Sequence, residues 1–137
     1  MSDHNSTEAK ILVVDDEKIM RDLVQRILNK AGYQVETKDD GEAALERLAE
    51  SDFDMVISDV NMPGLGGFEL LKEVKKQYPQ TAVIMMTGYA DTFTIKDALM
   101  FGADEYITKP FKHYEVTVVV ERALWRLQSA RQQSQTP

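Results

Sequence analysis

Five polar residues each follow an apolar stretch that has the character of a β-strand. Asp15 and Asp16 follow residues 11–14, Asp59 follows 55–58, Thr87 follows 82–86 and Lys109 follows 105–108. In an open parallel sheet the carboxyl ends of the strands share one edge, where ligand sites form. A single aspartate after a strand is more often only the N-cap of the next helix. Three carboxylates, a hydroxyl and an ammonium at one edge instead predict a pocket.

The chemistry of such a pocket follows from its charges. Three crowded carboxylates repel one another and raise at least one pKa unless a cation balances them. Oxygen ligands favour a hard divalent ion, Mg²⁺ with Mn²⁺ as the alternative. Lys109 would offer a point charge and Thr87 a hydroxyl donor to phosphoryl oxygens. The set therefore suits phosphoryl transfer, in which a carboxylate can itself act as nucleophile and form an aspartyl-phosphate.

Composition excludes several other functions. The chain has 137 residues, enough for one domain, and its net charge of −7 opposes direct binding to nucleic acid. It has no cysteine and only two histidines, His4 and His113, so thiol and imidazole catalysis are improbable. No apolar run reaches the roughly 18 residues of a membrane span, and the first residues do not resemble a signal peptide. We expect a cytoplasmic protein that does not bind membranes.

Strand-like and helical periodicities alternate five times along the chain. The expected strands cover residues 11–14, 33–38, 55–58, 82–86 and 105–108, and the expected helices cover about 19–31, 41–51, 68–78, 91–101 and 113–132. This order predicts one doubly wound α/β domain, a parallel sheet with helices on both faces. We assign residues 1–8 to a disordered polar tail, 9–127 to the domain, and 128–137 to a helix extension and frayed tail. Since few residues follow the last helix, the chain either acts alone or is part of a longer regulator.

Four segments resemble the receiver domain of bacterial two-component response regulators. They are ILVVDDE (11–17), DMVISDVNMPGLGG (54–67), IMMTGY (84–89) and YITKPF (106–111). The resemblance covers about residues 9–127, and order, type and spacing agree throughout. It implies a flavodoxin-like (βα)5 fold with the strand order 2-1-3-4-5.

The resemblance also implies a role for each site residue. Asp59 would accept a phosphoryl group from a sensor histidine kinase or a phosphotransfer protein. Mg²⁺ would be held by Asp16 and Asp59 directly, by Asp15 through water, and by the backbone carbonyl of Asn61. Thr87 and Lys109 would contact the phosphoryl group, and Lys109–Pro110 would be a cis peptide bond.

The sequence also predicts an output face, which is a surface that would contact a partner protein. Tyr106 matches an aromatic switch position whose ring turns inward when Thr87 moves, although a half-buried strand aromatic is the simpler interpretation without the motif. We expect the helix over 91–101 to bury Ile95, Ala98, Leu99 and Gly102, and the last helix to bury Val116, Val120, Ala123 and Leu127. Phe93, Met100, Tyr106 and Trp125 would then border a face for a partner or a homodimer. The alternative is that these apolar residues are merely scattered on the surface.

Three functions remain open from the sequence. The first is a signalling switch that assists its own phosphorylation and slow dephosphorylation without being an enzyme in the usual sense. The second is a phosphatase with an aspartyl-phosphate intermediate, but Asn61 stands where such an enzyme would need a second catalytic aspartate. The third is a scaffold independent of phosphorylation, which the retention of all five polar residues disfavours.

Overall fold

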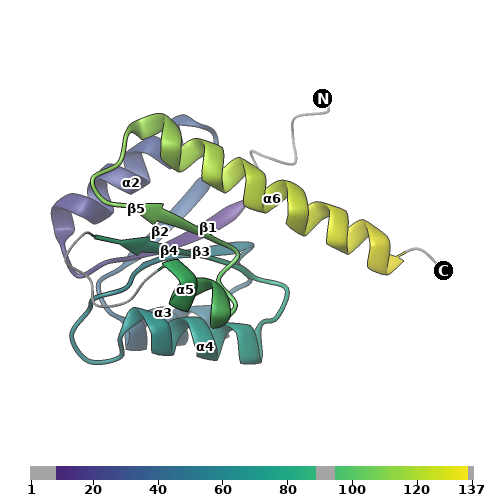
Figure 1. Ribbon diagram of the computed structural model, residues 1–137, viewed down its shortest axis with the longest axis horizontal. Coiled ribbons are helices and arrows are strands. Elements are labelled where there is room, and N and C mark those ends of the chain that lie inside the picture. The colour runs from purple at the N-terminus through teal and green to yellow at the C-terminus, as the bar shows by residue number, and fades with distance from the viewer. Residues whose placement is uncertain (1–8, 89–94, 136–137) are drawn as a thin grey trace.

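The computed structural model describes residues 9–88 and 95–135 (Figure 1). Within them the elements are β1 (Lys10–Val14), α2 (Lys18–Lys30), β2 (Gln34–Lys38), α3 (Gly41–Glu50), β3 (Met55–Asp59), α4 (Gly67–Gln77), β4 (Ala82–Thr87), α5 (Ile95–Met100), β5 (Glu105–Thr108) and α6 (His113–Gln135). The predicted tail 1–8, Phe93 and the first part of the helix expected over 91–101 lie outside the described residues.

The five strands form one parallel sheet in the order β2-β1-β3-β4-β5. Helices α2 and α6 cover one face, and α3, α4 and α5 cover the other (Figure 1). The predicted doubly wound fold and its strand order are confirmed. After β1 the chain moves to β2 on one side and then crosses to β3 on the other, so the winding reverses between β1 and β3. The carboxyl ends of these two strands therefore border the crevice in which ligands bind in such sheets.

Strand β1 shows why the central strands are apolar without interruption. Ile11 and Val13 belong to the core between the sheet and helices α2 and α6, whereas Leu12 and Val14 belong to the core on the opposite face. Successive side chains of a strand point to opposite faces, so a strand covered on both sides needs apolar residues at every position.

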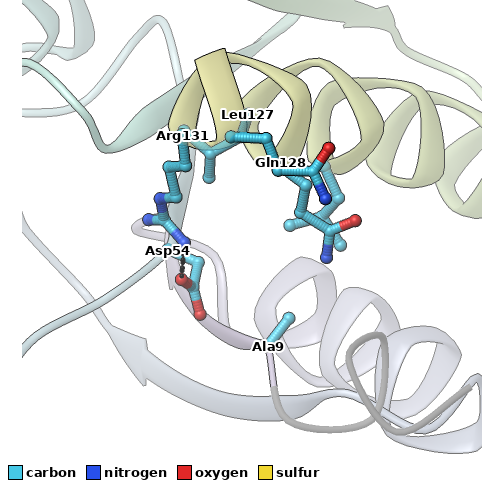
Figure 2. A pocket seen from close by; sticks show the side chains of 7 residues that line it. Ala9, Asp54, Leu127, Gln128 and Arg131 are labelled. Atoms are coloured by element: carbon cyan, nitrogen blue, oxygen red, sulfur yellow. Dashed lines mark hydrogen bonds and ion pairs between the residues drawn. The ribbon is translucent and has the colours of Figure 1, made fainter. Parts of the chain in front are cut away.

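Helix α6 follows its predicted pattern and extends beyond it. Val116, Val120 and Ala123 are buried, and Leu127 is partly buried against the same core. The helix continues to Gln135, three residues past the expected end. Its C-terminal part is tied to the amino edge of the sheet, where Arg131 Nη1 lies 3.1 Å from Asp54 Oδ1 beside a cavity of about 390 Å³ (Figure 2). None of the described helices combines the length and apolar character needed to cross a bilayer.

Two burial predictions for helix α5 are wrong. Ala98 is fully buried as expected, but Leu99 is 49% exposed and Gly102 is also exposed. Among residues 96–100 of α5, Ala98 is the buried position, and Leu99 beside it turns towards solvent. The side chain of Ile95, also expected to be buried, lies outside the described residues. Phe101 contacts the neighbouring helix instead, with its ring edge-on to Phe68 at a centroid distance of 5.4 Å.

A buried carboxylate ties α6 to the edge strand β5. Glu105 is 8% exposed, and its oxygens accept hydrogen bonds from Arg122 Nε at 2.9 Å and Nη2 at 2.8 Å, and from Arg126. Burial raises the pKa of the Glu105 carboxyl, but the hydrogen bonds and charges of the two arginines outweigh burial and hold the pKa below its ordinary value of 4.5. The ionised form therefore stabilises the folded state.

Glu105→Gln should lower the free energy of unfolding by about 1 to 2 kcal/mol at neutral pH, because it weakens charged hydrogen bonds to a buried group. Since the folded-state pKa is depressed, this contribution is complete above pH 4.5 and is lost as the pH falls towards the folded-state value. Urea unfolding of wild type and variant at several pH values measures the difference. Glu121→Gln, at an exposed position of α6, is the control. A gap between wild type and Glu105→Gln that does not narrow in acid contradicts the assignment.

Candidate functional site

The first two aspartates stand where β1 ends at the carboxyl edge. The Asp15 amide still donates to the carbonyl of Lys38, at 3.2 Å, and so continues the sheet by one residue. The Asp15 carboxylate then accepts a hydrogen bond from the amide of Glu17 at 2.9 Å. This local bond turns the chain into α2 and leaves Asp16 exposed at the bend.

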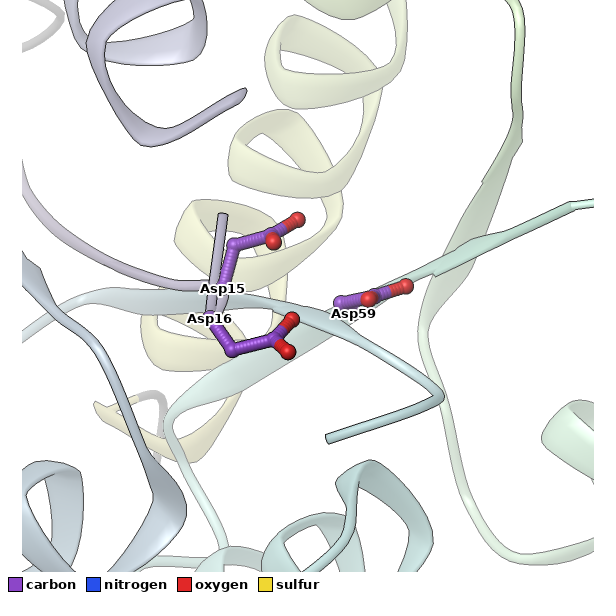
Figure 3. Close-up of side chains that lie close together, drawn as sticks. All are labelled: Asp15, Asp16 and Asp59. Carbon is purple, nitrogen blue, oxygen red and sulfur yellow. The ribbon is translucent and has the colours of Figure 1, made fainter. Parts of the chain in front are cut away.

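Asp59 lies opposite Asp15 because of the register between β1 and β3. Val14 pairs with Ser58, so the next residue of each strand carries its carboxylate to the same point. Asp15, Asp16 and Asp59 can each present one oxygen such that all three oxygens lie within 4.8 Å of one another (Figure 3). Asp15 is fully buried, Asp59 is 7% exposed and Asp16 is exposed. Three converging oxygens are the donor set of a hard divalent cation.

Lys109 brings a positive charge from the far strand β5. Its Nζ lies 3.1 Å from Asp59 Oδ1 and 3.3 Å from Asp15 Oδ2. The Lys109 amide donates to the carbonyl of Thr87, and the Lys109–Pro110 bond is cis as the resemblance implied. The three carboxylates therefore carry two more charges than this ammonium can balance.

Burial and charge act on the ionisable groups in opposite directions. Burial lowers the pKa of the Lys109 ammonium, but the carboxylates of Asp59 and Asp15 outweigh burial, so this pKa is raised and Lys109 stays charged. Burial also raises the pKa of Asp15, and here it outweighs the hydrogen bond from Glu17 and the charge of Lys109. A cation close to Asp15 would act against burial and favour the ionised form of this carboxylate.

The remaining predicted site residues divide between this edge and the elements along β5. Thr87 is the last residue of β4 and is buried, and Asn61 is exposed two residues after Asp59. Tyr106 is half-buried on β5, opposite Met85. Met100 and Trp125, on the helices either side of the β5 edge, are 72% and 69% exposed. The structure thus joins Asp15, Asp59 and Lys109 directly and groups Asp16 with the two aspartates. Thr87 ends the neighbouring strand β4, and Asn61 lies in the loop that follows Asp59.

Gly67, the first residue of α4, is a part of the site that was not predicted from the sequence. Its amide donates to the Val60 carbonyl at 3.0 Å, which closes the loop that follows Asp59. A Cβ at Gly67 would overlap the backbone carbonyl oxygen of Asp59 and lie 2.8 Å from Val60 Cα. Only glycine allows α4 to approach Asp59 this closely, and the Gly66–Gly67 pair before a helix was the available signal.

The fold and this edge define a doubly wound α/β domain with an acidic pocket at its switch point. A profile described as response regulator receiver domain matches residues 11–121, and the chain belongs to this family of two-component signalling domains. Receiver domains are signalling modules rather than classical enzymes. The resemblance stated from the sequence is confirmed.

Curated relatives share this part of the chain at similar identity. The chain is 38% identical to the transcriptional regulatory protein FixJ of Bradyrhizobium diazoefficiens over 125 residues, which is 91% of the chain and 61% of FixJ. It is also 38% identical to the DNA-binding transcriptional regulator NtrC of Escherichia coli, over 89% of the chain and 26% of NtrC. The chain therefore spans less than two thirds of these relatives.

Solved structures agree on the fold. The chemotaxis response regulator CheY4 of Vibrio cholerae superposes with a TM-score of 0.78 at 37% identity, covering 85% of this chain and 98% of CheY4. NtrX from Brucella abortus, solved with ADP, superposes with a TM-score of 0.88 at 39% identity, covering 93% of this chain and 29% of NtrX. One neighbour thus matches along nearly its whole length and the other through a part of a longer chain.

Gly67→Ala should lower the free energy of unfolding by about 1 to 3 kcal/mol, because the added methyl group meets fixed backbone atoms. Gly66→Ala is the matched control, since a Cβ there would come closer than 3.0 Å only to the end of the flexible Glu69 side chain, at 2.9 Å, and would stay 3.9 Å from the Val60 carbonyl oxygen. Chemical denaturation of both variants gives the comparison. Equal losses would show that close approach to Asp59 is not what requires a glycine.

Proposed function

We propose that this chain is a phosphorylation switch in which Asp59 accepts a phosphoryl group from a sensor histidine kinase or a phosphotransfer protein. The observation that carries the proposal is the Lys109 ammonium 3.1 Å from Asp59 Oδ1, within a cluster of three carboxylates. A receiver domain that only served as a scaffold would have no need to bury these charges together.

The residues present fit a divalent cation by their oxygen-only chemistry and their excess negative charge. We assign Asp16, Asp59 and the backbone carbonyl of Asn61 as direct ligands, and Asp15 as a ligand through water. When bound, Mg²⁺ or Mn²⁺ would neutralise charge on the carboxylates and on the incoming phosphoryl oxygens.

The transfer step uses the carboxylate as nucleophile. An Asp59 oxygen forms a bond to phosphorus while the bond from phosphorus to the donor nitrogen breaks, and the electron pair of that bond leaves with the imidazole. Lys109 holds one phosphoryl oxygen by its charge, and the Thr87 hydroxyl donates a hydrogen bond to another. Water later attacks the aspartyl-phosphate, which returns the Asp59 carboxylate and inorganic phosphate. The domain assists this slow dephosphorylation on itself.

Phosphorylation would change the surface on the β5 side of the sheet. Thr87 is bonded through its carbonyl to the Lys109 amide, and its neighbour across the sheet is Thr108. Movement of Thr87 towards a phosphoryl group would free space that the half-buried ring of Tyr106 can fill. The change would reach the exposed Met100 and Trp125, which we propose as part of a face for a second copy or another partner protein. Phe93 belongs to the same proposal.

Binding of this domain to nucleic acid is not part of the proposal, because its net charge is −7. FixJ and NtrC are transcriptional regulators, so control of transcription is an output that a longer form of this protein would serve through another domain. A cytoplasmic location remains a prediction of the sequence.

Incubation with acetyl phosphate and Mg²⁺, followed by mass spectrometry of the intact protein, tests the switch. We expect the mass of one phosphoryl group, which disappears in Asp59→Asn and when a chelator is added. Asp52→Asn, at an exposed position before β3, is the control and should be labelled like the wild type. Labelling that persists in Asp59→Asn contradicts the assignment of Asp59. Turnover of unrelated phosphomonoesters would instead indicate a phosphatase.

The proposed face predicts a change in self-association. Analytical ultracentrifugation with beryllofluoride, a phosphoryl mimic, should show a higher mass than the untreated protein. Trp125→Ala should reduce this increase, because it removes a large exposed apolar side chain from the interface. Ile19→Ala removes an apolar residue of α2 that is even more exposed, at 85% against 69% for Trp125, and should have no effect. An unchanged mass of the wild type with beryllofluoride excludes the homodimer.

A further inference from the structure

The loop of residues 60–66, here called the acceptor loop, is held at both ends. At its base the Val60 amide donates to the Met86 carbonyl, and the Gly67 amide donates to the Val60 carbonyl, both at 3.0 Å. Shortly before its C-terminal end, the Leu65 amide donates to Glu42 Oε2 at 3.2 Å. Glu42 belongs to the first turn of α3, which is far from the acceptor loop in sequence.

Two glycines let the Glu42 carboxylate lie across the end of the loop. Gly64 has a φ of +75°, and a Cβ there would stand 3.3 Å from Glu42 Oε2. Gly41 is buried, and a Cβ there would stand 2.8 Å from the Leu65 carbonyl oxygen and 2.9 Å from Leu65 Cδ2. The start of α3 and the Gly64–Leu65 segment are therefore in direct contact.

The start of α3 is itself well fixed. Asp40 caps the helix, and its side chain accepts a hydrogen bond from the Ala43 amide at 2.7 Å. The Glu42 carboxylate also lies near the positive end of the helix dipole. The hydrogen bond to Leu65 thus joins the acceptor loop to a rigid element rather than to another loop.

We propose that Glu42 is a positioning residue for the metal site, because it restrains the loop that carries the Asn61 carbonyl. This inference rests on the proposed function, in which that carbonyl is a ligand. The loop contains Gly64 and Gly66, whose backbones lose much conformational freedom when ordered. A restraint that exists before the cation arrives lowers this entropic cost of binding, and groups that orient ligands in this way act on metal affinity. Glu42 does not touch the cation or the phosphoryl group.

The test is the affinity of the unphosphorylated protein for Mg²⁺, measured by isothermal titration calorimetry. Glu42→Ala should weaken Mg²⁺ binding by about tenfold, the lower end of the range for residues that orient ligands. Glu42→Gln removes the charge but keeps an oxygen that accepts the Leu65 amide, so it should bind Mg²⁺ nearly as well as the wild type. Gly41→Ala displaces Leu65 without changing any charge and should weaken binding as Glu42→Ala does.

Glu46→Ala is the matched control. Glu46 lies one turn further along α3, is exposed and carries the same charge. Its removal should leave Mg²⁺ affinity unchanged. Thermal unfolding of all variants shows whether the exposed position 42 affects only the loop, as expected, or the whole fold.

Three outcomes would overturn the inference. The first is a Glu42→Ala variant that binds Mg²⁺ as tightly as the wild type. The second is an equal loss of Mg²⁺ affinity in Glu42→Ala and Glu42→Gln, which would indicate an effect of the charge over a long range. The third is loss of the folded state in Glu42→Ala. The proposed function has a separate failure. If the wild type neither binds Mg²⁺ nor gains a phosphoryl group on Asp59, the switch itself is wrong, whereas a normal wild type with an unaffected Glu42→Ala refutes only the role of Glu42.

Discussion

The ammonium of Lys109, held between the carboxylates of Asp59 and Asp15, is the interaction on which the site depends. An unpaired buried charge is costly, so each of the three groups needs the other two in place. They come from β5, β3 and the end of β1, and only a sheet in which these strands are parallel brings their carboxyl ends to one edge. The topology and the chemistry therefore share one requirement. The apolar runs form the parallel strands, and the charged residues follow the carboxyl ends of those strands.

A second set of charges holds the other end of strand β5. Glu105, at the start of β5, binds Arg122 and Arg126 of α6, while Lys109, just after the end of β5, binds the acidic site. One short strand is thus fixed at both ends by ion pairs, with Tyr106 between them. In the proposed switch, these ion pairs would restrain β5 against a shift along its length, so we expect the response to be a rotation of the Tyr106 side chain.

Sequence reasoning succeeded where local pattern and burial agree. The strands were predictable because both faces of the sheet are covered. The meeting of Asp15, Asp59 and Lys109 at one edge was predictable because each of them follows such a strand. The strand order came from the resemblance to receiver domains, since alternation of elements alone does not distinguish it. The prediction of Leu99 as buried was wrong because Ala98, the residue before it, takes the inward position in the described part of α5, and Leu99 therefore faces outward. The polar end of α6 carried no apolar signal, so its extension to Gln135 was not predicted.

Contacts between distant segments were beyond the sequence for another reason. The approach of Gly67 to Asp59 and the bond from Leu65 to Glu42 depend on how two loops meet, and no periodicity encodes that. The charged groups of the site also differ in how deeply they are buried. Burial decreases from Asp15 through Asp59 to Asp16, and Lys109 lies against the two more buried carboxylates. In the proposed switch, a cation and a phosphoryl donor would therefore approach from the exposed side of Asp16 and the acceptor loop, where the contacts that hold the loop would also set the position of the Asn61 carbonyl.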